Sequence, residues 1–515
     1  MRDLSLDSTV LNVGDATQTF LDNAIIESVQ DVTRRWHRPK RITSESLIRR
    51  DRPWEHTLYF TYSNHCVLWD EQERLFRCWY EDLEGPPKPT GGHFGFFSRQ
   101  LYAQSSDGLE WEKPSLDIAK YDGMPTNIVL GGREYGQVHS ASYVIDKHPR
   151  VPDERFRTIY TFIQDDGAVV RSECAHSPDG LHWQVYGEKP SCGSCGAKLG
   201  DVSVLFYDDD AHQFVQNTRH CAMGRRPFDS RLPRNRSFNP PHEPHHFDAY
   251  RQRRVFQSRS HDFIHWTELI AVAAADDYED NLDESFYGMA QWRSGTIHLA
   301  TVGVLHMVDN TMDVQLLMSR DGIRWQRTAK RQPFLSPRGA GSWDAYMVSL
   351  TSPPVPVGDE LFFFHGGSGV HHDWWMTGIR EGLDHPESNH PDRAVFGLGL
   401  AKLRKDGYAS LAANELREGI ICTRALAVQG QRLEINGRCA PGGYIRVELA
   451  DSSNHIVGAC SKALCDALEG DSVSHVASWS GSDAIPALKD KSPTDLKLRF
   501  YLKNAELFSF RFCDS

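Results

Sequence analysis

The stretch Ser105-Ser106-Asp107-Gly108-Leu109-Glu110-Trp111 has three close copies further along the chain, each with Ser first, Asp third and Trp last. The copies are residues 177–183, 260–266 and 319–325, and residues 404–408 keep a worn fifth copy of the Asp-Gly step. Glycine tolerates the positive φ of a tight turn, and the tryptophan supplies a large apolar anchor. The Asp residues lie 59 to 85 positions apart, which suits a four-stranded antiparallel blade with long loops. The repeat therefore predicts five blades around a central axis.

The bulk composition is typical of a folded globular protein. The 515 residues are 40% hydrophobic and 24% charged, which leaves room for a large core and more than one domain. A net charge of −12 argues against nucleic-acid binding, because that needs clustered positive charge. The first residues lack the apolar core of a signal peptide, and no apolar run is long enough to span a bilayer. We therefore expect a cytoplasmic protein with no membrane contact.

The cysteines give little sign of a metal or a disulfide framework. Eleven cysteines without a regular spacing are typical of reduced thiols. Cys192 and Cys195 have the spacing of half a zinc site, but no second half completes it. We therefore predict no cofactor and no metal ligands. A propeller axis can still hold a structural calcium ion among carboxylates and water, although no contiguous calcium loop is visible.

Three segments follow from the extent of the repeat. Residues 1–53 are predicted to form an N-terminal arm that packs on the propeller, residues 54–412 the five-bladed β-propeller with the catalytic site, and residues 413–515 a β-sandwich. Stretches such as 444–449 and 496–502 alternate apolar with polar residues, as the strands of a two-sheet sandwich do. The predicted fold class is all-β, a five-bladed β-propeller followed by a C-terminal β-sandwich.

Two long insertions interrupt the blades. Residues 224–254 are rich in Arg, Pro and His, and residues 370–393 include several histidines. A four-stranded blade needs neither segment. Two interpretations are open for them: surface loops that are solvated or buried at a subunit contact in a homo-oligomer, or a wall that rises over one mouth of the propeller and shapes a pocket.

The chain resembles the glycoside hydrolase family 32 group of β-fructofuranosidases, and more closely the bacterial proteins described as family 32-like. The matching stretches are Arg52-Pro53-Trp54-Glu55, Cys78-Trp79-Tyr80, the four Trp turns, Phe286-Tyr287-Gly288-Met289, Gly341-Ser342-Trp343-Asp344 and residues 397–401. The resemblance implies cleavage of a terminal fructofuranoside- or arabinofuranoside-type bond. The family's Asn-Asp-Pro-Asn and Arg-Asp-Pro segments are absent, and the Glu-Cys pair at Glu173-Cys174 lies one blade too early for the family's acid/base.

Carboxylates stand where the innermost strand of several blades is expected to begin. Glycoside cleavage needs one carboxyl group that protonates the departing oxygen and a second that attacks the anomeric carbon or activates water. We predict Asp201 as nucleophile or base and Glu284 as acid/base, with Asp283 as a competitor of Glu284. Glu55 and Asp344 are predicted to bind sugar hydroxyls. The family's blade order would instead make Glu55 the nucleophile and Asp201 the acid/base.

Aromatic and imidazole side chains near the same strand ends complete the predicted site. A sugar ring presents C–H groups to an aromatic face while its hydroxyls seek polar partners. The candidates for substrate binding are Trp54, His139, Trp343, His371 and His372. The tryptophans of the repeat turns are expected in the core between strands.

Three functional classes fit these residues. The first is a glycoside hydrolase that acts on a glycoside or oligosaccharide with paired carboxylates in the propeller funnel, and this is the predicted function. The second is a carbohydrate-binding propeller without catalysis, which the same fold can host. The third is an anhydrosugar hydrolase or lyase in which a histidine acts as the acid, a class that the 24 histidines keep open.

Overall fold

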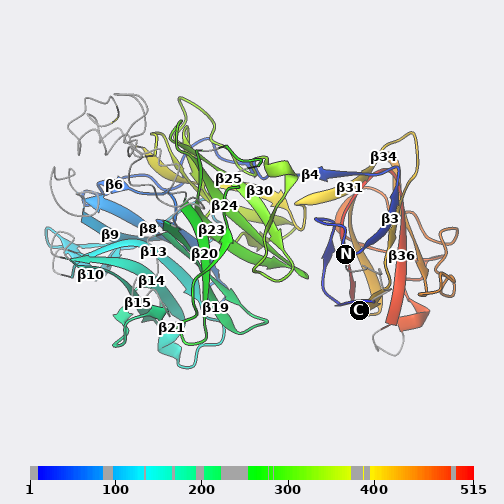
Figure 1. The fold of residues 1–515 in the computed structure, drawn as a ribbon, viewed down its shortest axis with the longest axis horizontal. Coiled ribbons are helices and arrows are strands. Elements are labelled where there is room, and N and C mark those ends of the chain that lie inside the picture. Colours follow the sequence, from blue (N-terminus) through cyan, green and yellow to red (C-terminus); the bar gives the residue numbers. More distant parts are fainter. Residues whose placement is uncertain are drawn as a thin grey trace.

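The computed structural model describes residues 10–84, 97–132, 135–164, 169–192, 202–221, 253–276, 278–281, 283–372, 387, 395–488 and 494–514. These residues contain β-strands, 3-10 turns at Pro152–Glu154, Ala329–Arg331 and Pro486–Leu488, and no α-helix. The prediction of an all-β fold is confirmed. Figure 1 shows two lobes, a larger one that contains β6 to β30 and a smaller one around β34 and β36. Within the described part of the chain, no helix has the length and apolarity needed to cross a membrane.

Three antiparallel sheets follow one another along the larger lobe. They contain β6 (Thr57–Leu58), β7 (His65–Asp70), β8 (Leu75–Glu84), β9 (Phe97–Ser105) and β12 (Ile128–Leu130); β13 (Gln137–Ile145), β14 (Phe156–Gln164), β15 (Val169–Ser177) and β16 (Gln184–Val185); and β18 (Val202–Asp208), β19 (Gln213–Cys221), β20 (Arg253–Ser260) and β22 (Ile270–Ala273). Two short pairs lie beside them: β10 (Leu116–Tyr121) with β11 (Met124–Thr126), and β17 (Ser191–Cys192) with β21 (His265–Trp266).

A nine-stranded sheet completes the larger lobe. Its strands are β23 (Glu284–Ser294), β24 (Ile297–His306), β25 (Thr311–Ser319), β26 (Gln326–Arg327), β27 (Met347–Ser349), β28 (Val355–Val357), β29 (Glu360–Ser368), β30 (Phe396–Arg404) and β5 (Lys40–Arg41). One parallel residue pair, Met312 with Met347, joins the half that contains β23 to the half that contains β29. This division fits two blades within one sheet, and the count of five blades stays a prediction.

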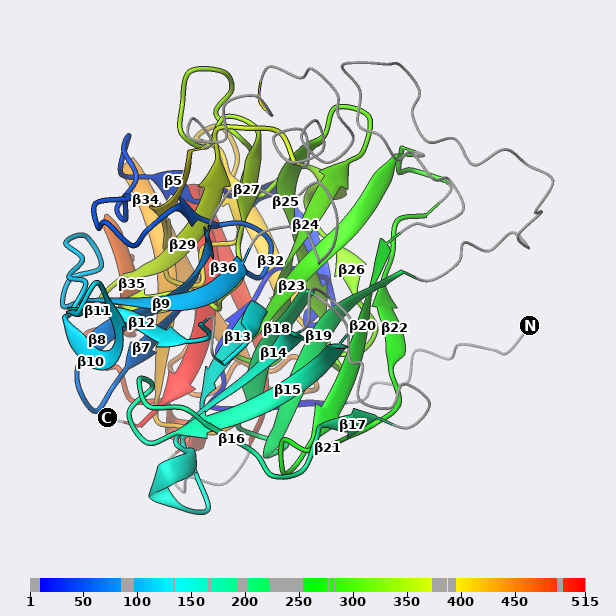
Figure 2. The same ribbon diagram turned by 90° about the vertical axis from the view of Figure 1, so that its left-hand side faces the viewer.

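The first strands of successive sheets pack against one another. β7 contacts β13, β13 contacts β18, and β18 contacts β23, and Figure 2 shows β13, β18 and β23 side by side near the middle of the lobe. Residues at the starts of these strands therefore lie close together, although they belong to different sheets. This is the arrangement that positions the candidate site.

The repeated turns share one set of hydrogen bonds. In the second copy the Ser177 hydroxyl accepts the N–H of Gly180 at 2.9 Å, and Asp179 Oδ1 accepts the N–H groups of Leu181 and His182, each at 2.9 Å. Gly180 has a φ of 76°, and a Cβ there would lie 2.8 Å from the indole of Trp79 on the preceding sheet. Glycine is therefore required both by the backbone and by the close approach between sheets.

The smaller lobe joins strands from both ends of the chain. It contains β1 (Leu11–Gly14), β2 (Gln18–Thr19), β3 (Ile26–Gln30), β4 (Thr33–Trp36), β31 (Ala409–Ala413), β32 (Gly419–Thr423), β33 (Leu426–Val428), β34 (Arg432–Ala450), β35 (Asp471–Val476) and β36 (Thr494–Cys513). Hydrogen bonds connect them in one ten-stranded sheet around an apolar core that includes Leu433, Ile445 and Phe500. The two-sheet sandwich stays a prediction.

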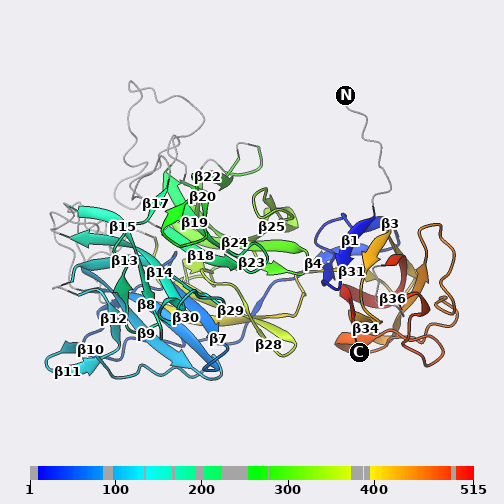
Figure 3. The same cartoon turned by 90° about the horizontal axis from the view of Figure 1, so that it is seen from below.

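The N-terminal arm takes part in both lobes. It gives β1 to β4 to the smaller lobe, where β1 pairs with β33 and β4 with β31, while Leu21 and Ile48 pack with core residues of the larger lobe. The prediction that residues 1–53 pack on the propeller did not include the smaller lobe. Only β5 pairs with the propeller strand β30. Figures 1 and 3 place β4 and β31 at the junction of the lobes. The reason is that the strands of the smaller lobe need edge partners, and the arm supplies their hydrogen bonds.

Replacing Asp179 by Ala should lower the free energy of unfolding by about 1 kcal/mol, as the loss of a similar side-chain cap does. Burial alone raises the pKa of Asp179, but hydrogen bonds from His182, Leu181 and Ser177 outweigh it and hold the pKa at about 2. The stabilisation of the fold by the ionised Asp179 carboxylate is therefore complete above the ordinary pKa of 3.8, and it is lost as the pH falls towards 2. Thermal melts across this range measure the effect, with the exposed Asp309→Ala as control. The prediction is contradicted if the stability difference between the wild type and Asp179→Ala does not decrease as the pH falls.

Candidate active site

A pocket of about 50 Å³ lies where the first strands of the sheets meet, and we call it the axial pocket. Residues from all four large sheets or the segments next to them line it, so it is a property of the assembled lobe and not of one blade. The lining residues are Tyr59, Tyr62, Asn64, His139, Ser140, Val202, Arg219, Arg253, Tyr287 and His372.

A histidine and a carboxylate form a direct pair at this pocket. His139 Nδ1 lies 2.7 Å from Oε1 of Glu81, whose side chain is completely buried on β8. Burial alone raises the pKa of Glu81, but His139, Asn64 and the Ser140 N–H outweigh it and hold the pKa below its ordinary value. The carboxylate is therefore ionised and only accepts hydrogen bonds, so Nδ1 of His139 carries a proton. This fixes the orientation of the imidazole ring.

An unusual backbone conformation supports this pair. Neighbouring side chains of a regular strand point to opposite faces, yet Ser140 Oγ lies 3.2 Å from Nε2 of His139. Ser140 has a φ of 51°, and the register of β13 shifts between His139 and Ser142. The bulge turns Ser140 so that its N–H also reaches Glu81 at 2.9 Å. Such a conformation costs about 1–3 kcal/mol and is typical of functional sites.

The opposite wall of the axial pocket carries two arginines and a tyrosine. Arg219 on β19 and Arg253 on β20 are diagonal neighbours, because Arg219 pairs with Val255. Their guanidinium carbons lie 4.4 and 4.7 Å from the ring centre of Tyr287. Tyr62 stacks on that ring at 4.7 Å. Aromatic and cationic groups thus share one small space.

Of the two predicted catalytic carboxylates, Asp201 and Glu284, only Glu284 is described by the structure. Asp201 lies outside the described residues, but the next residue, Val202, lines the axial pocket. Glu284 is described and is not a lining residue. Its Oε1 accepts a hydrogen bond from Asn281 Nδ2 at 2.9 Å. Glu284 and Phe286 share one face of β23, ahead of the register shift between Phe286 and Met289, and Phe286 packs in a different core cluster from Tyr287.

Glu284 nevertheless has the electrostatics of a proton donor. Burial, and then the neighbouring Asp280, raise the pKa of its carboxyl group. His306 Nδ1 lies 3.9 Å away. Its predicted competitor Asp283 accepts the N–H of Val308 at 3.1 Å and does not line the axial pocket. The structure therefore does not bring these two acids to the pocket.

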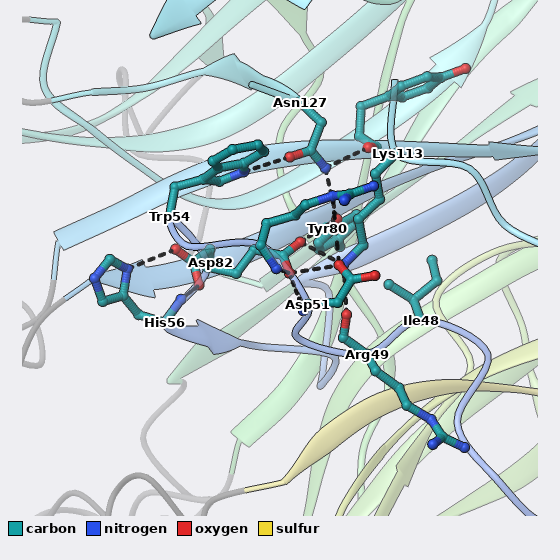
Figure 4. Close-up of polar contacts among 12 residues, drawn as sticks. Ile48, Arg49, Asp51, Trp54, His56, Tyr80, Asp82, Lys113 and Asn127 are labelled. Carbon is teal, nitrogen blue, oxygen red and sulfur yellow. Dashed lines mark hydrogen bonds and ion pairs between the residues drawn. The ribbon is translucent and has the colours of Figure 1, made fainter. Parts of the chain in front are cut away.

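Glu55 is held by structural partners. Its carboxylate accepts hydrogen bonds from the N–H groups of Asp51 and Arg52 at 2.9 and 3.1 Å, and from the Tyr80 hydroxyl at 3.2 Å. Lys113 Nζ lies 2.7 Å from Oε1, and its side chain is 5% exposed. Figure 4 shows Lys113, Tyr80 and Asp51 converging from separate segments. That Glu55 binds sugar stays a prediction, and in this structure both its oxygens already join parts of the fold.

Trp54 is also part of this structural network. It is 7% exposed, and its Nε1 donates to Asn127 Oδ1 at 2.8 Å. Asn127 Nδ2 in turn donates to the Tyr80 hydroxyl at 2.9 Å, as Figure 4 shows. The indole predicted to bind substrate is buried here with its polar atom satisfied.

Asp344 and Trp343 are adjacent in the sequence, but their side chains have different surroundings. Asp344 is completely buried, 2.5 Å from Arg338 Nε and 3.0 Å from Arg41 Nε, so it forms a structural ion pair. Trp343 lines a second cavity of about 270 Å³ together with Arg49, Arg50, His56 and Phe396 among others. Phe396 touches Tyr59 of the axial pocket, with ring centres 5.2 Å apart.

The two predicted histidines of the insertion at 370–393 also differ. His372 lines the axial pocket, and its Nε2 lies 2.8 Å from the Tyr287 hydroxyl. His371 is paired with Glu387, with Nδ1 2.6 Å from Oε1, and stacks on Tyr346 at 3.8 Å. The rest of that insertion, and residues 224–252 of the basic one, lie outside the described residues. Arg253 at the end of the basic insertion lines the pocket.

The sequence analysis did not identify Glu81 and Arg219 as site residues. Both lie inside strands, where a charged residue is expected to face solvent. A signal was present in both cases: Glu81 and Asp82 follow the buried Cys78-Trp79-Tyr80, and Arg219 ends the polar run Gln216-Asn217-Thr218. Polar runs within strands that must face an axis indicate a site and not solvent. Within the described residues, no group of three or more His, Cys, Asp or Glu side chains is placed to hold a metal ion.

No protein-family model and no curated protein matches this chain, so the family 32 resemblance stays a prediction. Among solved structures, a glycosyl hydrolase from Bacteroides ovatus aligns with a TM-score of 0.44 at 13% identity, over 72% of this chain and 94% of its own. A structure from work on the GH130 family of mannoside phosphorylases and β-1,2-mannoside hydrolases gives 0.45 at 11%, over 72% and 94%. An N-acetylgalactosamine deacetylase from F. plautii gives 0.38 at 14%, over 73% and 96%. These neighbours are carbohydrate-active proteins, but similarities this weak assign no activity here.

Replacing Glu55 by Gln should cost about 3 kcal/mol of unfolding free energy, because it leaves Lys113 buried with only Asp51 as counter-charge. The double variant Glu55→Gln/Lys113→Met should recover part of this loss. Urea unfolding measures both changes. If Glu55 is structural, the double variant also recovers turnover. A double variant that regains stability but stays inactive would support Glu55 as the nucleophile.

Proposed function

We propose that this chain is a carbohydrate-active hydrolase that cleaves a terminal glycosidic bond in the axial pocket, with His139 as the proton donor. The observation that carries the proposal is the 2.7 Å contact between His139 Nδ1 and the buried, ionised Glu81. A carboxylate behind a histidine stabilises the imidazolium form and orients the ring. The aromatic ring of Tyr62, which lines the same pocket, suits the C–H face of a sugar.

In this proposal His139 Nε2 gives its proton to the departing glycosidic oxygen. The predicted partner is Asp201, which precedes the pocket residue Val202 and would attack the anomeric carbon or activate water. The rival proton donor is Glu284, which the sequence favoured but which does not line the pocket. A fructofuranoside- or arabinofuranoside-type sugar, as the family 32 resemblance implies, is the first substrate class to test.

His139→Gln should reduce turnover of an alkyl glycoside or oligosaccharide by about 10²–10⁴-fold, because general acid catalysis contributes that much. The same variant should lose less than about tenfold on a 2,4-dinitrophenyl glycoside, since that leaving group departs without a proton. Initial rates on both substrates measure the difference. His455→Gln, far exposed on the smaller lobe, is the matched control.

The companion variants separate the two assignments. Glu81→Gln should behave like a milder His139→Gln, because it removes the charge that orients the ring. Glu284→Gln should stay within about tenfold of the wild type on both substrates. The proposal fails if His139→Gln turns over alkyl glycosides normally, or if Glu284→Gln alone shows the dependence on the leaving group. Glycan binding without turnover of any glycoside would instead support the carbohydrate-binding class.

A further inference from the structure

The cavity that Trp343 lines is several times larger than the axial pocket, and we call it the Trp343 cavity. Its volume is about 270 Å³, against about 50 Å³ for the axial pocket. Pockets for drug-sized ligands range from about 300 to 1,000 Å³, so the Trp343 cavity has the size for a single ring with its substituents. Its described lining residues come from three separate segments: residues 45–58, Trp343 and residues 395–396.

Trp343 is held in a fixed orientation at this cavity. Its ring stacks on His365, with ring centres 5.5 Å apart and planes 5° from parallel, and its Nε1 donates to the Ser44 carbonyl at 3.1 Å. Strands β29 and β30 leave space for the indole, because a Cβ at Gly367 or Gly399 would lie 2.6 or 2.8 Å from it. The Trp343 side chain remains partly exposed. An aromatic wall that is ordered before a ligand arrives costs little conformational entropy on binding.

The polar part of the lining contains both donors and acceptors. Glu45 and Arg49 form an ion pair at 3.0 Å, and both side chains are largely exposed. His56 Nδ1 lies 3.2 Å from Arg99 Nη2. A guanidinium only donates, so Nδ1 accepts this hydrogen bond and Nε2 carries the proton of the neutral ring. Because sugar hydroxyls both donate and accept, a mixed lining beside an aromatic wall suits an uncharged sugar.

The Trp343 cavity and the axial pocket share a wall. Leu58 lines the Trp343 cavity, and the next residue, Tyr59, lines the axial pocket. Phe396 of the Trp343 cavity contacts the Tyr59 ring in an edge-on arrangement, with ring centres 5.2 Å apart. The two cavities are therefore neighbours, as adjoining subsites for an oligosaccharide are.

We propose that the Trp343 cavity binds one uncharged sugar unit, with the indole against the C–H face of the sugar ring and the polar lining against its hydroxyls. This site goes beyond the proposed function, because binding there needs no bond cleavage. One consequence does rest on the proposed function. When an oligosaccharide is cleaved at the axial pocket, the unit in the Trp343 cavity is the neighbour of its terminal unit.

Equilibrium binding without turnover tests the site. The probes are neutral oligosaccharides of two to four units on a glycan array, followed by isothermal titration of the full chain with the sugars that bind. At least one neutral sugar should bind. Trp343→Ala should weaken that binding by about tenfold or more, because it removes the aromatic face and the apolar contact area. Thermal melts show whether this variant is folded.

Two exposed valines give a matched pair of variants that leaves the core unchanged. Val395 lines the Trp343 cavity and is 48% exposed, whereas Val357 on β28 is 37% exposed and is not among the described lining residues. Val395→Trp should fill the cavity and weaken binding by about tenfold or more, and Val357→Trp should bind as the wild type does.

The site is overturned if no neutral sugar binds, or if Val395→Trp or a folded Trp343→Ala binds as the wild type does. Where Trp343→Ala does not fold, Val395→Trp decides. Because neither measurement needs turnover, a failure of glycoside cleavage leaves this result intact.

Discussion

The constraint on which the larger lobe depends is the set of side-chain hydrogen bonds that closes each repeated turn. A serine hydroxyl and an aspartate oxygen accept the N–H groups that the turn leaves unpaired, as at Ser177 and Asp179. The glycine or, in the third copy, Phe263 with a φ of 72° then brings the turn against the preceding sheet. Because each sheet is fixed to its neighbour in this way, the first strands meet and gather His139, Arg219 and Tyr287.

Features with local causes could be predicted from the sequence. The turns, the all-β class and the presence of His139 near the axis follow from motifs of a few residues. The partner of the N-terminal arm could not, because Leu11 pairs with Leu426 from the other end of the chain and leaves no local pattern. Glu55 and Asp344 were selected by their place at strand starts, but position does not reveal that Lys113 and Arg338 neutralise them.

The axial pocket differs from those ion pairs in that its polar side chains line a cavity. The charges of Glu55 and Asp344 are paired with side chains that join separate segments of the chain. A buried ion pair of this kind adds little net stability. The charge of Glu81 is instead paired with the imidazole of His139, which lines the axial pocket. The strained backbone of Ser140 and the two guanidinium groups over Tyr287 lie at this pocket where the sheets meet, although packing alone would favour apolar side chains there.

The most direct test of this account is a crystal structure of the protein soaked with an uncleaved glycoside. The account predicts ligand density in the axial pocket, within hydrogen-bond distance of His139 Nε2 and of the Arg253 guanidinium. Density in the cavity beside Trp343 or on the smaller lobe, with only water in the axial pocket, would contradict it.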